Sequence, residues 1–297
     1  MKHDEHIGLL YALAGFATLS IGDVVVKTMA GMWPPTAIAA TRYAIGAMGL
    51  AVLLFVREGR AGFALPHLPV QLLRGLGVAM ATVGFFSAIA VIPLAAATAL
   101  TFTSPMITAL LAAVFLGEPV RRETWIASLV AFAGVLVVLR PNFAAAGFAA
   151  LLPLVAALGM SVLMIGNRFV AGKGSPLAMQ FSVAVVATPL LGLAMVVGDA
   201  TGLPSLAVAT PHWSVIARCA FIAVSASCAH WLIFMGTTRA GAGSIAPMTY
   251  IQLLIATLAG WAFFGDHPDA MTLLGAAMIV GAGLYLWRTG RAPAPAK

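Results

Sequence analysis

Charged side chains are scarce in this sequence, and their scarcity excludes most soluble folds. Only 8% of its 297 residues are Asp, Glu, Lys or Arg, whereas soluble domains carry about 25%. Hydrophobic residues make up 62% of the chain. A single aqueous core stops growing at roughly 250–300 residues, so this excess of apolar surface must face lipid. The composition therefore predicts an integral membrane protein whose solvent is the lipid bilayer.

Several chemical motifs are also missing. Cys219 and Cys228, the only 2 cysteines, are nine residues apart in one apolar segment, which places them on opposite faces of a helix and excludes a disulfide between them. The sequence has no Gly-x-x-x-x-Gly-Lys-Ser/Thr loop, and its 6 histidines form no His-Glu-x-x-His motif. We therefore expect no ATP-driven pump, no catalytic residue, no metal site and no cofactor.

Apolar runs long enough to cross a bilayer recur along the whole chain. A transmembrane helix needs about 20 apolar residues, and cutting the chain at charges, prolines and glycine clusters gives ten such spans. These observations predict an all-α integral membrane fold with ten transmembrane helices. The predicted spans are 7–30, 36–56, 70–92, 95–116, 124–139, 148–170, 176–197, 213–235, 241–264 and 270–287.

The distribution of basic residues predicts the orientation of these spans. Twelve of the 16 Lys and Arg residues fall on one side of the membrane, in alternate gaps or at the ends of the chain, and Arg140 is the clear exception on the other side. This bias places both termini in the cytoplasm. It also explains the net charge of +7 without a nucleic-acid partner. Residues 289–297, rich in Pro and Ala, are expected to form a disordered cytoplasmic tail.

The two halves of the sequence resemble each other. In one register Pro35 aligns with Pro176, and after a shift of register Phe102 aligns with Tyr250. Because each half has five spans, an odd number, the second copy must enter the membrane from the opposite side. We therefore predict two five-helix repeats of inverted topology, at residues 7–140 and 148–288. Such an arrangement usually brings a substrate site between the two halves.

Several stretches carry a family resemblance. They are Asp-Val-Val-Val-Lys at 23–27, Arg42, the run at 92–118 that ends in Leu-Gly-Glu, the run at 247–266 that ends in Phe-Gly-Asp, and the run at 273–287. Together they resemble the bacterial EamA-type ten-helix permeases of the drug/metabolite transporter superfamily. The resemblance implies a multi-pass protein of the bacterial inner membrane that carries amino acids, their derivatives, vitamins or cofactors without ATP.

Four ionisable residues are predicted inside the spans, where a Lys or Arg costs roughly 2.5–3.5 kcal/mol. They are Asp23, Lys27, Arg42 and Arg218. Asp23 and Lys27 are one helical turn apart and can pair. In the predicted orientation the three cations lie in the outer half of the membrane, and we hypothesise that an anionic group of the substrate completes the cluster. The alternatives are that the cations snorkel to the outer phosphates or that Asp23 and Lys27 form only a folding pair.

Aromatic and polar residues complete the predicted substrate site. His230 and Asp23 are the candidates for proton coupling, although an intramembrane His more often serves packing and a paired Asp23 is a poor proton carrier. Phenol and amide groups deep in a span need polar partners. The remaining predicted binding residues are Tyr43, Phe102, Trp231, Tyr250 and Gln252.

The sequence thus predicts a secondary transporter that works by alternating access. The outer cations favour an amino acid or an amino-acid-derived compound as the small-molecule substrate. An alternative is an uptake carrier for a vitamin or cofactor such as riboflavin or S-adenosylmethionine, which the aromatic set would accommodate. A passive channel or an intramembrane enzyme is the alternative of another class. Coupling to protons or to a counter-substrate, and assembly into a homodimer, are left open.

Overall fold

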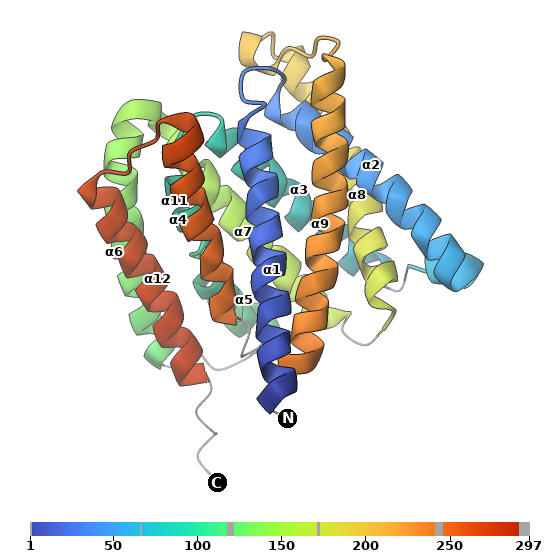
Figure 1. Ribbon diagram of the computed structural model, residues 1–297, viewed down its shortest axis with the longest axis horizontal. Coiled ribbons are helices and arrows are strands. Elements are labelled where there is room, and N and C mark those ends of the chain that lie inside the picture. The colour runs from blue at the N-terminus through green and yellow to red at the C-terminus, as the bar shows by residue number, and fades with distance from the viewer. Residues whose placement is uncertain (1, 66, 118–121, 171–172, 241–245, 291–297) are drawn as a thin grey trace. The chain divides into compact units, whose positions relative to one another are not determined.

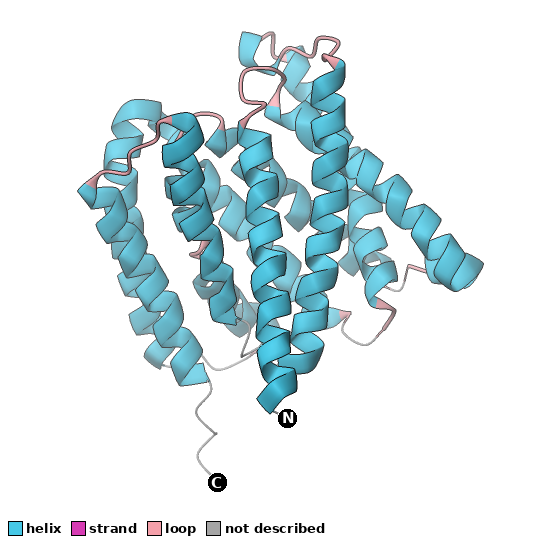
Figure 2. Cartoon of the chain, in the orientation of Figure 1, coloured by secondary structure: helices cyan, strands magenta, loops and turns pink. Residues whose placement is uncertain are grey.

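The computed structural model describes residues 2–65, 67–117, 122–170, 173–240 and 246–290. Within these residues every regular element is a helix and no strand occurs (Figure 2). In the same part of the chain, 9 helical segments are long and apolar enough to cross a membrane, and a shorter apolar helix covers Met248–Phe264. The predicted all-α membrane fold with ten helices is confirmed.

The helices follow the predicted spans to within a few residues at most ends. The predicted spans 95–116, 148–170 and 241–264 each contain two helical pieces. The last helix continues to Gly290, so residues 289 and 290 are helical, and the rest of the predicted tail lies outside the described residues. The elements are α1 (Lys2–Lys27), α2 (Pro35–Glu58), η1 (Gly59–Phe63), α3 (Leu68–Ile89), α4 (Leu94–Thr101), α5 (Ser104–Leu116), α6 (Arg122–Ala146), η2 (Gly147–Leu151), α7 (Leu152–Phe169), α8 (Pro176–Ala200), η3 (Pro204–Leu206), α9 (Trp213–Ala240), η4 (Ala246–Tyr250), α11 (Ile251–Phe264) and α12 (Ala270–Gly290) (Figure 1).

Glycine ends the two helices α5 and α11 in the same way. Gly117 and Gly265 both adopt φ 65°, a left-handed conformation that glycine reaches without a Cβ penalty. The N–H of Gly117 bonds to Ala112 O, and that of Gly265 bonds to Gly260 O. The two caps are therefore equivalent, and they keep the register in which the sequence comparison aligned Phe102 with Tyr250.

The membrane segments at α4–α5 and η4–α11 both change between α and 3-10 geometry at an aromatic residue. Phe102 follows α4, and its N–H bonds back to Ala99 O at 3.2 Å as in a 3-10 turn. Pro105 lacks an N–H, so the next helical bond to the Thr101 carbonyl cannot form. In the second half, a 3-10 turn ends at Tyr250 and α11 begins at the next residue.

The chain divides into two compact units, and neither corresponds to one half of the sequence. The first unit comprises Met1–Val24, Ile92–Ala150 and Ser225–Lys297. The second unit comprises Val25–Val91 and Leu151–Val224. Each unit thus combines helices from both halves, and α1 and α9 each contribute to both.

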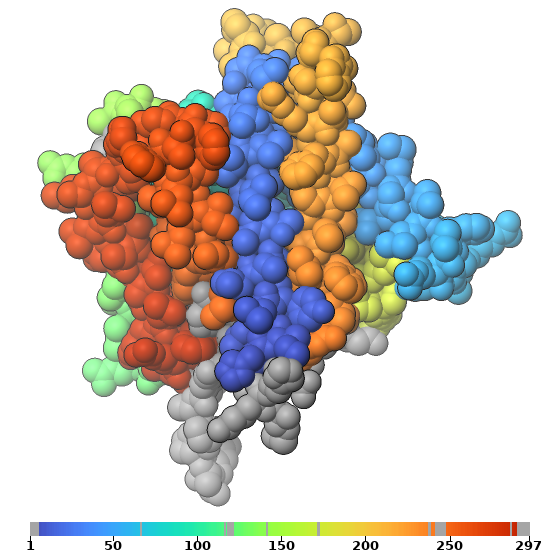
Figure 3. Space-filling view, viewed as in Figure 1, coloured from blue at the N-terminus to red at the C-terminus, as the bar shows by residue number. Residues whose placement is uncertain are grey.

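Helices of the first unit approach each other through glycine. A Cβ on Gly15 would lie 2.8 Å from the carbonyl oxygen of Ala229 in α9, and one on Gly236 would lie 2.8 Å from Gly8 O in α1. Figure 1 shows α1 beside α9 and α6 beside α12, and Figure 3 shows the amino-terminal part of α1 in contact with the carboxyl-terminal part of α9. Close backbone approach through small residues is a general means of packing membrane helices.

The second unit repeats this packing with α3 and α7. A Cβ on Gly84 would lie 2.8 Å from Leu152 O, and one on Gly77 would lie 2.7 Å from Gly159 O. Helix α3 also packs on α8, where Gly75 accommodates the side chain of Val186. Helix α2 packs along α8 in the same unit.

The glycine contacts of the two units correspond residue by residue. Gly84 meets Leu152 O and Ala156 N, and Gly236 in the same way meets Gly8 O and Ala12 N. The α3–α7 pair and the α9–α1 pair therefore have the same crossing. This packing matches Gly8 of α1 with Leu152 of α7, a register that differs from the one set by the prolines that begin α2 and α8.

Candidate functional site

Arg42 lies among aromatic rings in the second unit. Its guanidinium carbon is 4.9 Å from the centroid of the Tyr43 ring and 5.4 Å from that of the Phe86 ring. Both distances are within the range of cation–π attraction. The described residues supply this guanidinium with no hydrogen-bond acceptor and no carboxylate. Arg42 is therefore held in place by ring contacts, while its hydrogen-bond donors have no protein acceptor in the described part of the chain.

Neighbouring helices fix the two rings. Tyr43 Oη accepts a hydrogen bond from Thr82 Oγ1 at 3.3 Å, which ties α2 to α3. Phe86 is only 3% exposed, so its ring is held by packing. Rigid rings give Arg42 a defined position, as a substrate-binding group requires.

A small crevice adjoins the Phe86 ring. Lys27, another predicted site residue, is part of its wall. Phe86 therefore lies next to two of the three predicted cations, Lys27 and Arg42. Trp33 also lines the crevice, and its Nε1 donates to Ala209 O at 2.9 Å. The full lining is Val26, Lys27, Ala30, Trp33, Pro35, Ile38, Phe86, Ile89 and Ala90.

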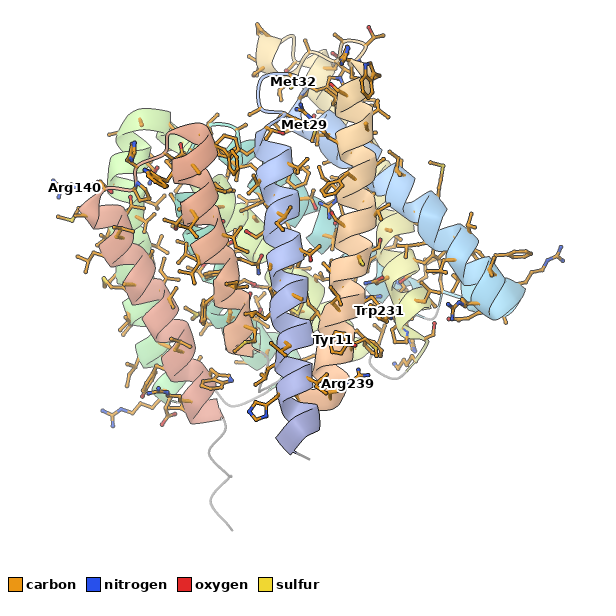
Figure 4. All side chains as sticks on the ribbon, viewed as in Figure 1. Tyr11, Met29, Met32, Arg140, Trp231 and Arg239 are labelled. Atoms are coloured by element: carbon orange, nitrogen blue, oxygen red, sulfur yellow. The ribbon has the colours of Figure 1, made fainter. Side chains whose placement is uncertain are left out.

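Arg218 differs from Arg42 because protein groups lie within hydrogen-bond distance of one of its guanidinium nitrogens. Its Nη1 lies 3.3 Å from Thr28 O and 3.4 Å from Thr28 Oγ1, just after the end of α1. The same nitrogen lies 3.4 Å from the sulfur of Met32, which Figure 4 labels in the turn after α1. A cation at a helix carboxyl end is favoured by the helix dipole. These contacts connect Arg218 of α9 to the turn that follows α1.

Phe102 and Tyr250 meet in the first unit. Their ring centroids are 5.3 Å apart and the rings are nearly perpendicular, at 87°. This edge-to-face contact joins the two membrane segments at the point where each changes its helical geometry. The alignment of Phe102 with Tyr250, made from sequence alone, thus pairs two residues that touch each other.

Gln252 and Ser20 lie beside this aromatic contact. The Gln252 amide donates to Thr249 Oγ1 at 2.9 Å, and Ser20 Oγ donates to the Gln252 carbonyl oxygen at 3.2 Å. Ser20 is 1% exposed, so its hydroxyl is buried and satisfied. The amide of Gln252 therefore has a partner within its own turn.

The remaining predicted site residues are on the surface of their helices or only partly buried. The imidazole of His230 is exposed, with Nδ1 2.6 Å from Ala226 O. Trp231 is 54% exposed, and Figure 4 shows it projecting from α9. Asp23 is partly buried on α1, one turn before Lys27.

Arg74 is a buried cation. In the sequence analysis it served only as one of the basic residues that predict the orientation of the spans. It is 5% exposed in α3 and bonds to three helices. Its Nε donates to Asn167 Oδ1 at 2.7 Å, and its other nitrogens donate to the side chains of Gln71 and Ser182 and to Met179 O. All these partners are uncharged. The sequence did contain a sign of this buried network, because Gln71 and Arg74 are two polar residues three positions apart in an apolar run.

A cation held among rings inside a membrane span marks a substrate pathway in many transporters. Comparison with known proteins agrees with this class. The model of the EamA-like transporter family matches residues 6–140 and 147–288, so this chain belongs to the EamA-like transporter family. It is a bacterial multi-pass inner-membrane protein that transports a small metabolite.

The chain is similar over its whole length to named transporters. It is 28% identical to a riboflavin transporter of Rhizobium johnstonii, over 95% of this chain and 91% of that protein. It is 26% identical to an S-adenosylmethionine uptake transporter of Rickettsia prowazekii, over 94% and 92%. It is 29% identical to the pseudopaline exporter CntI of Pseudomonas aeruginosa, over 95% and 96%. A solved crystal structure shares the fold, with a TM-score of 0.61, 20% identity and coverage of 98% and 99%.

Proposed function

We propose that this protein is an alternating-access carrier of an amino acid or amino-acid-derived compound, and that Arg42 binds the carboxylate of the substrate. The observation that carries the proposal is the Arg42 guanidinium within cation–π distance of the Tyr43 and Phe86 rings, without an anionic partner among the described residues. A carboxylate satisfies this group better than any neutral ligand, since charge-assisted bonds to arginine are short, strong and bidentate. Lys27, in the wall of the adjoining crevice, adds positive charge.

The remaining predicted binding residues extend this proposal. Phe102 and Tyr250 are proposed as an aromatic subsite, because their rings meet where each membrane segment changes its helical geometry. The two five-helix repeats of inverted topology, with both termini in the cytoplasm, are part of the same proposal. The proposal also includes proton coupling through Asp23 or His230, or exchange against a counter-substrate. It further includes assembly into a homodimer.

A vitamin or cofactor is the second candidate substrate, and one observation favours it. The relatives named above are described as transporters of riboflavin and of S-adenosylmethionine. Both compounds carry flat rings, which the rings of Trp33, Phe86 and Tyr43 are suited to contact. S-adenosylmethionine also carries an amino-acid carboxylate, so it belongs to both candidate substrate classes.

Uptake and counterflow in proteoliposomes test the proposal. A labelled panel of amino acids, riboflavin and S-adenosylmethionine is offered to the wild type, to Arg42→Gln and to the control Arg140→Gln, whose arginine is exposed at the end of a span. We expect one carboxylate-bearing compound to exchange, Arg42→Gln to lose it, and Arg140→Gln to keep it. Exchange that is indifferent to Arg42→Gln would show that the cluster only supports folding.

A further inference from the structure

An apolar groove runs between α3 and α8 on the surface of the second unit. Its volume is about 600 Å³, and its walls are aliphatic. The side chains of Leu72, Leu73 and Leu76 are 51%, 39% and 45% exposed, so the groove faces outward from both helices. The full lining is Pro69, Leu72, Leu73, Leu76, Val185, Val186, Pro189 and Leu190.

Two basic side chains meet close to one end of this groove. Lys173 Nζ lies 3.1 Å from His67 Nε2, and His67 is two residues before Pro69 in the groove wall. With the imidazole neutral, the lysine donates the hydrogen bond and the pair carries a positive charge. Ser175, two residues after Lys173, donates a hydrogen bond from its Oγ to the carboxylate of Glu58 at 2.6 Å.

The backbone of His67 is unusual. Its φ of 54° is the one positive value at a non-glycine residue in the described ranges, and it stands at the N-cap of α3. Left-handed backbone at a residue with a side chain costs free energy and is often retained at functional positions. Here that conformation accompanies the contact of the imidazole with Lys173.

The length of the groove matches one leaflet of a bilayer. From His67 to Leu76 the helix rises about 13 Å at 1.5 Å per residue, and half of the hydrocarbon core is about 15 Å. The basic pair therefore lies at the depth of lipid headgroups when Leu76 lies near the midplane. Lys173 is also among the basic residues that predict the cytoplasmic side, where anionic lipids attract positive charge.

We propose that this groove binds an anionic phospholipid. One acyl chain lies against Leu72, Leu76 and the facing wall of α8, and the phosphate contacts Lys173 and His67. The charge of the pair selects an anionic headgroup over a zwitterionic one of the same chain length. The site is separate from the Arg42 cluster and holds a lipid as a bound ligand, whatever substrate the protein carries.

Native mass spectrometry of the detergent-purified protein tests this proposal with dioleoyl phosphatidylglycerol and dioleoyl phosphatidylcholine as probes. We expect about fivefold tighter binding of the anionic lipid, as one basic residue near a headgroup provides. The variant Lys173→Gln combined with His67→Gly should abolish this preference, since glycine keeps the left-handed backbone and lacks the imidazole. The control Arg60→Gln removes an exposed charge on η1 and should keep the preference.

A second variant tests the groove itself. Leu76→Trp fills it and should lower binding of both lipids, whereas Leu193→Trp, at an exposed position of α8 outside the groove, should not. Equal binding of the two lipids by the wild type overturns the proposal. So does a Leu76→Trp protein that binds lipid normally but changes its oligomeric mass, because the groove is then a contact between two copies.

Discussion

Gly134 and Gly275 face each other across the α6–α12 crossing, and each lies against the carbonyl oxygen of the other. A Cβ on Gly134 would lie 2.8 Å from Gly275 O, and a Cβ on Gly275 would lie 2.6 Å from Gly134 O. The crossing is thus symmetric, and the two glycines correspond in the same register as Pro35 and Pro176. Any side chain at either position must push the two backbones apart.

We therefore expect Gly134→Val to destabilise the first unit by about 1–3 kcal/mol, the usual cost of overpacking. The midpoint of thermal unfolding in detergent measures this effect. Gly281→Val is the matched control, because a Cβ at Gly281 on α12 meets no atom within 4 Å. Equal midpoints for the two variants would contradict the close crossing.

Arg74→Lys is expected to destabilise the second unit by about 1–3 kcal/mol, the cost of leaving a buried polar group without its partner. A single ammonium group cannot reach Asn167 Oδ1, Ser182 Oγ and Met179 O together, as the guanidinium does. Thermal unfolding again provides the measurement, with Arg60→Lys as the exposed control.

Asn167→Asp refines the same prediction. It offers Arg74 an anionic partner at the position of the present amide oxygen, 2.7 Å from Nε. We expect this variant to fold at least as well as Arg74→Lys and to retain the unfolding midpoint of the wild type. A large loss of stability in Asn167→Asp would mean that the network depends on the amide N–H of Asn167.

Much of this architecture could be predicted from the sequence, because a bilayer imposes a long apolar run on every spanning helix. The equivalence of Phe102 with Tyr250 followed from the repeat, because the runs that end in Leu-Gly-Glu and Phe-Gly-Asp set the same register. The network of Arg74 could not be predicted. Its partners Asn167 and Ser182 belong to α7 and α8, far along the chain, and only the packing of three helices brings them together.

The position of Arg218 shows a similar limit. The sequence placed Arg218 inside a span but did not identify its acceptors, which are in the turn after α1. Turn geometry at a helix end depends on local backbone conformation that a hydropathy pattern does not contain. The register that matches α1 with α7 aligns Ala12 with Ala156 and Gly15 with Gly159. It was missed because the sequence comparison took its register from Pro35 and Pro176, which lie beyond these helices.

Stability should depend on pH through Asp269, which caps α12 outside the membrane. Its carboxylate accepts from Thr272 N at 2.8 Å, and hydrogen bonds from Thr272 lower the pKa of Asp269 below its usual value. A lowered pKa in the folded state stabilises the fold above the unfolded pKa, and this contribution disappears as the pH falls through the folded value. We expect Asp269→Ala to unfold at lower temperature than the wild type near pH 7 and at the same temperature well below pH 3.8. A difference independent of pH would contradict the cap.

Gly283→Ala should abolish transport through the aromatic contact. A Cβ on Gly283 in α12 would overlap Tyr250 Oη, so the alanine must displace the phenol and with it the edge-to-face contact with Phe102. Removing the hydroxyl relieves the overlap, and we expect the double variant Gly283→Ala with Tyr250→Phe to recover most of the counterflow. The control is Gly281→Ala, two residues away on α12, where an added Cβ meets no atom within 4 Å. It makes the same glycine-to-alanine change in the helix without the overlap. If the double variant stays as inactive as Gly283→Ala alone while both proteins remain folded, the position of the Tyr250 ring does not govern transport.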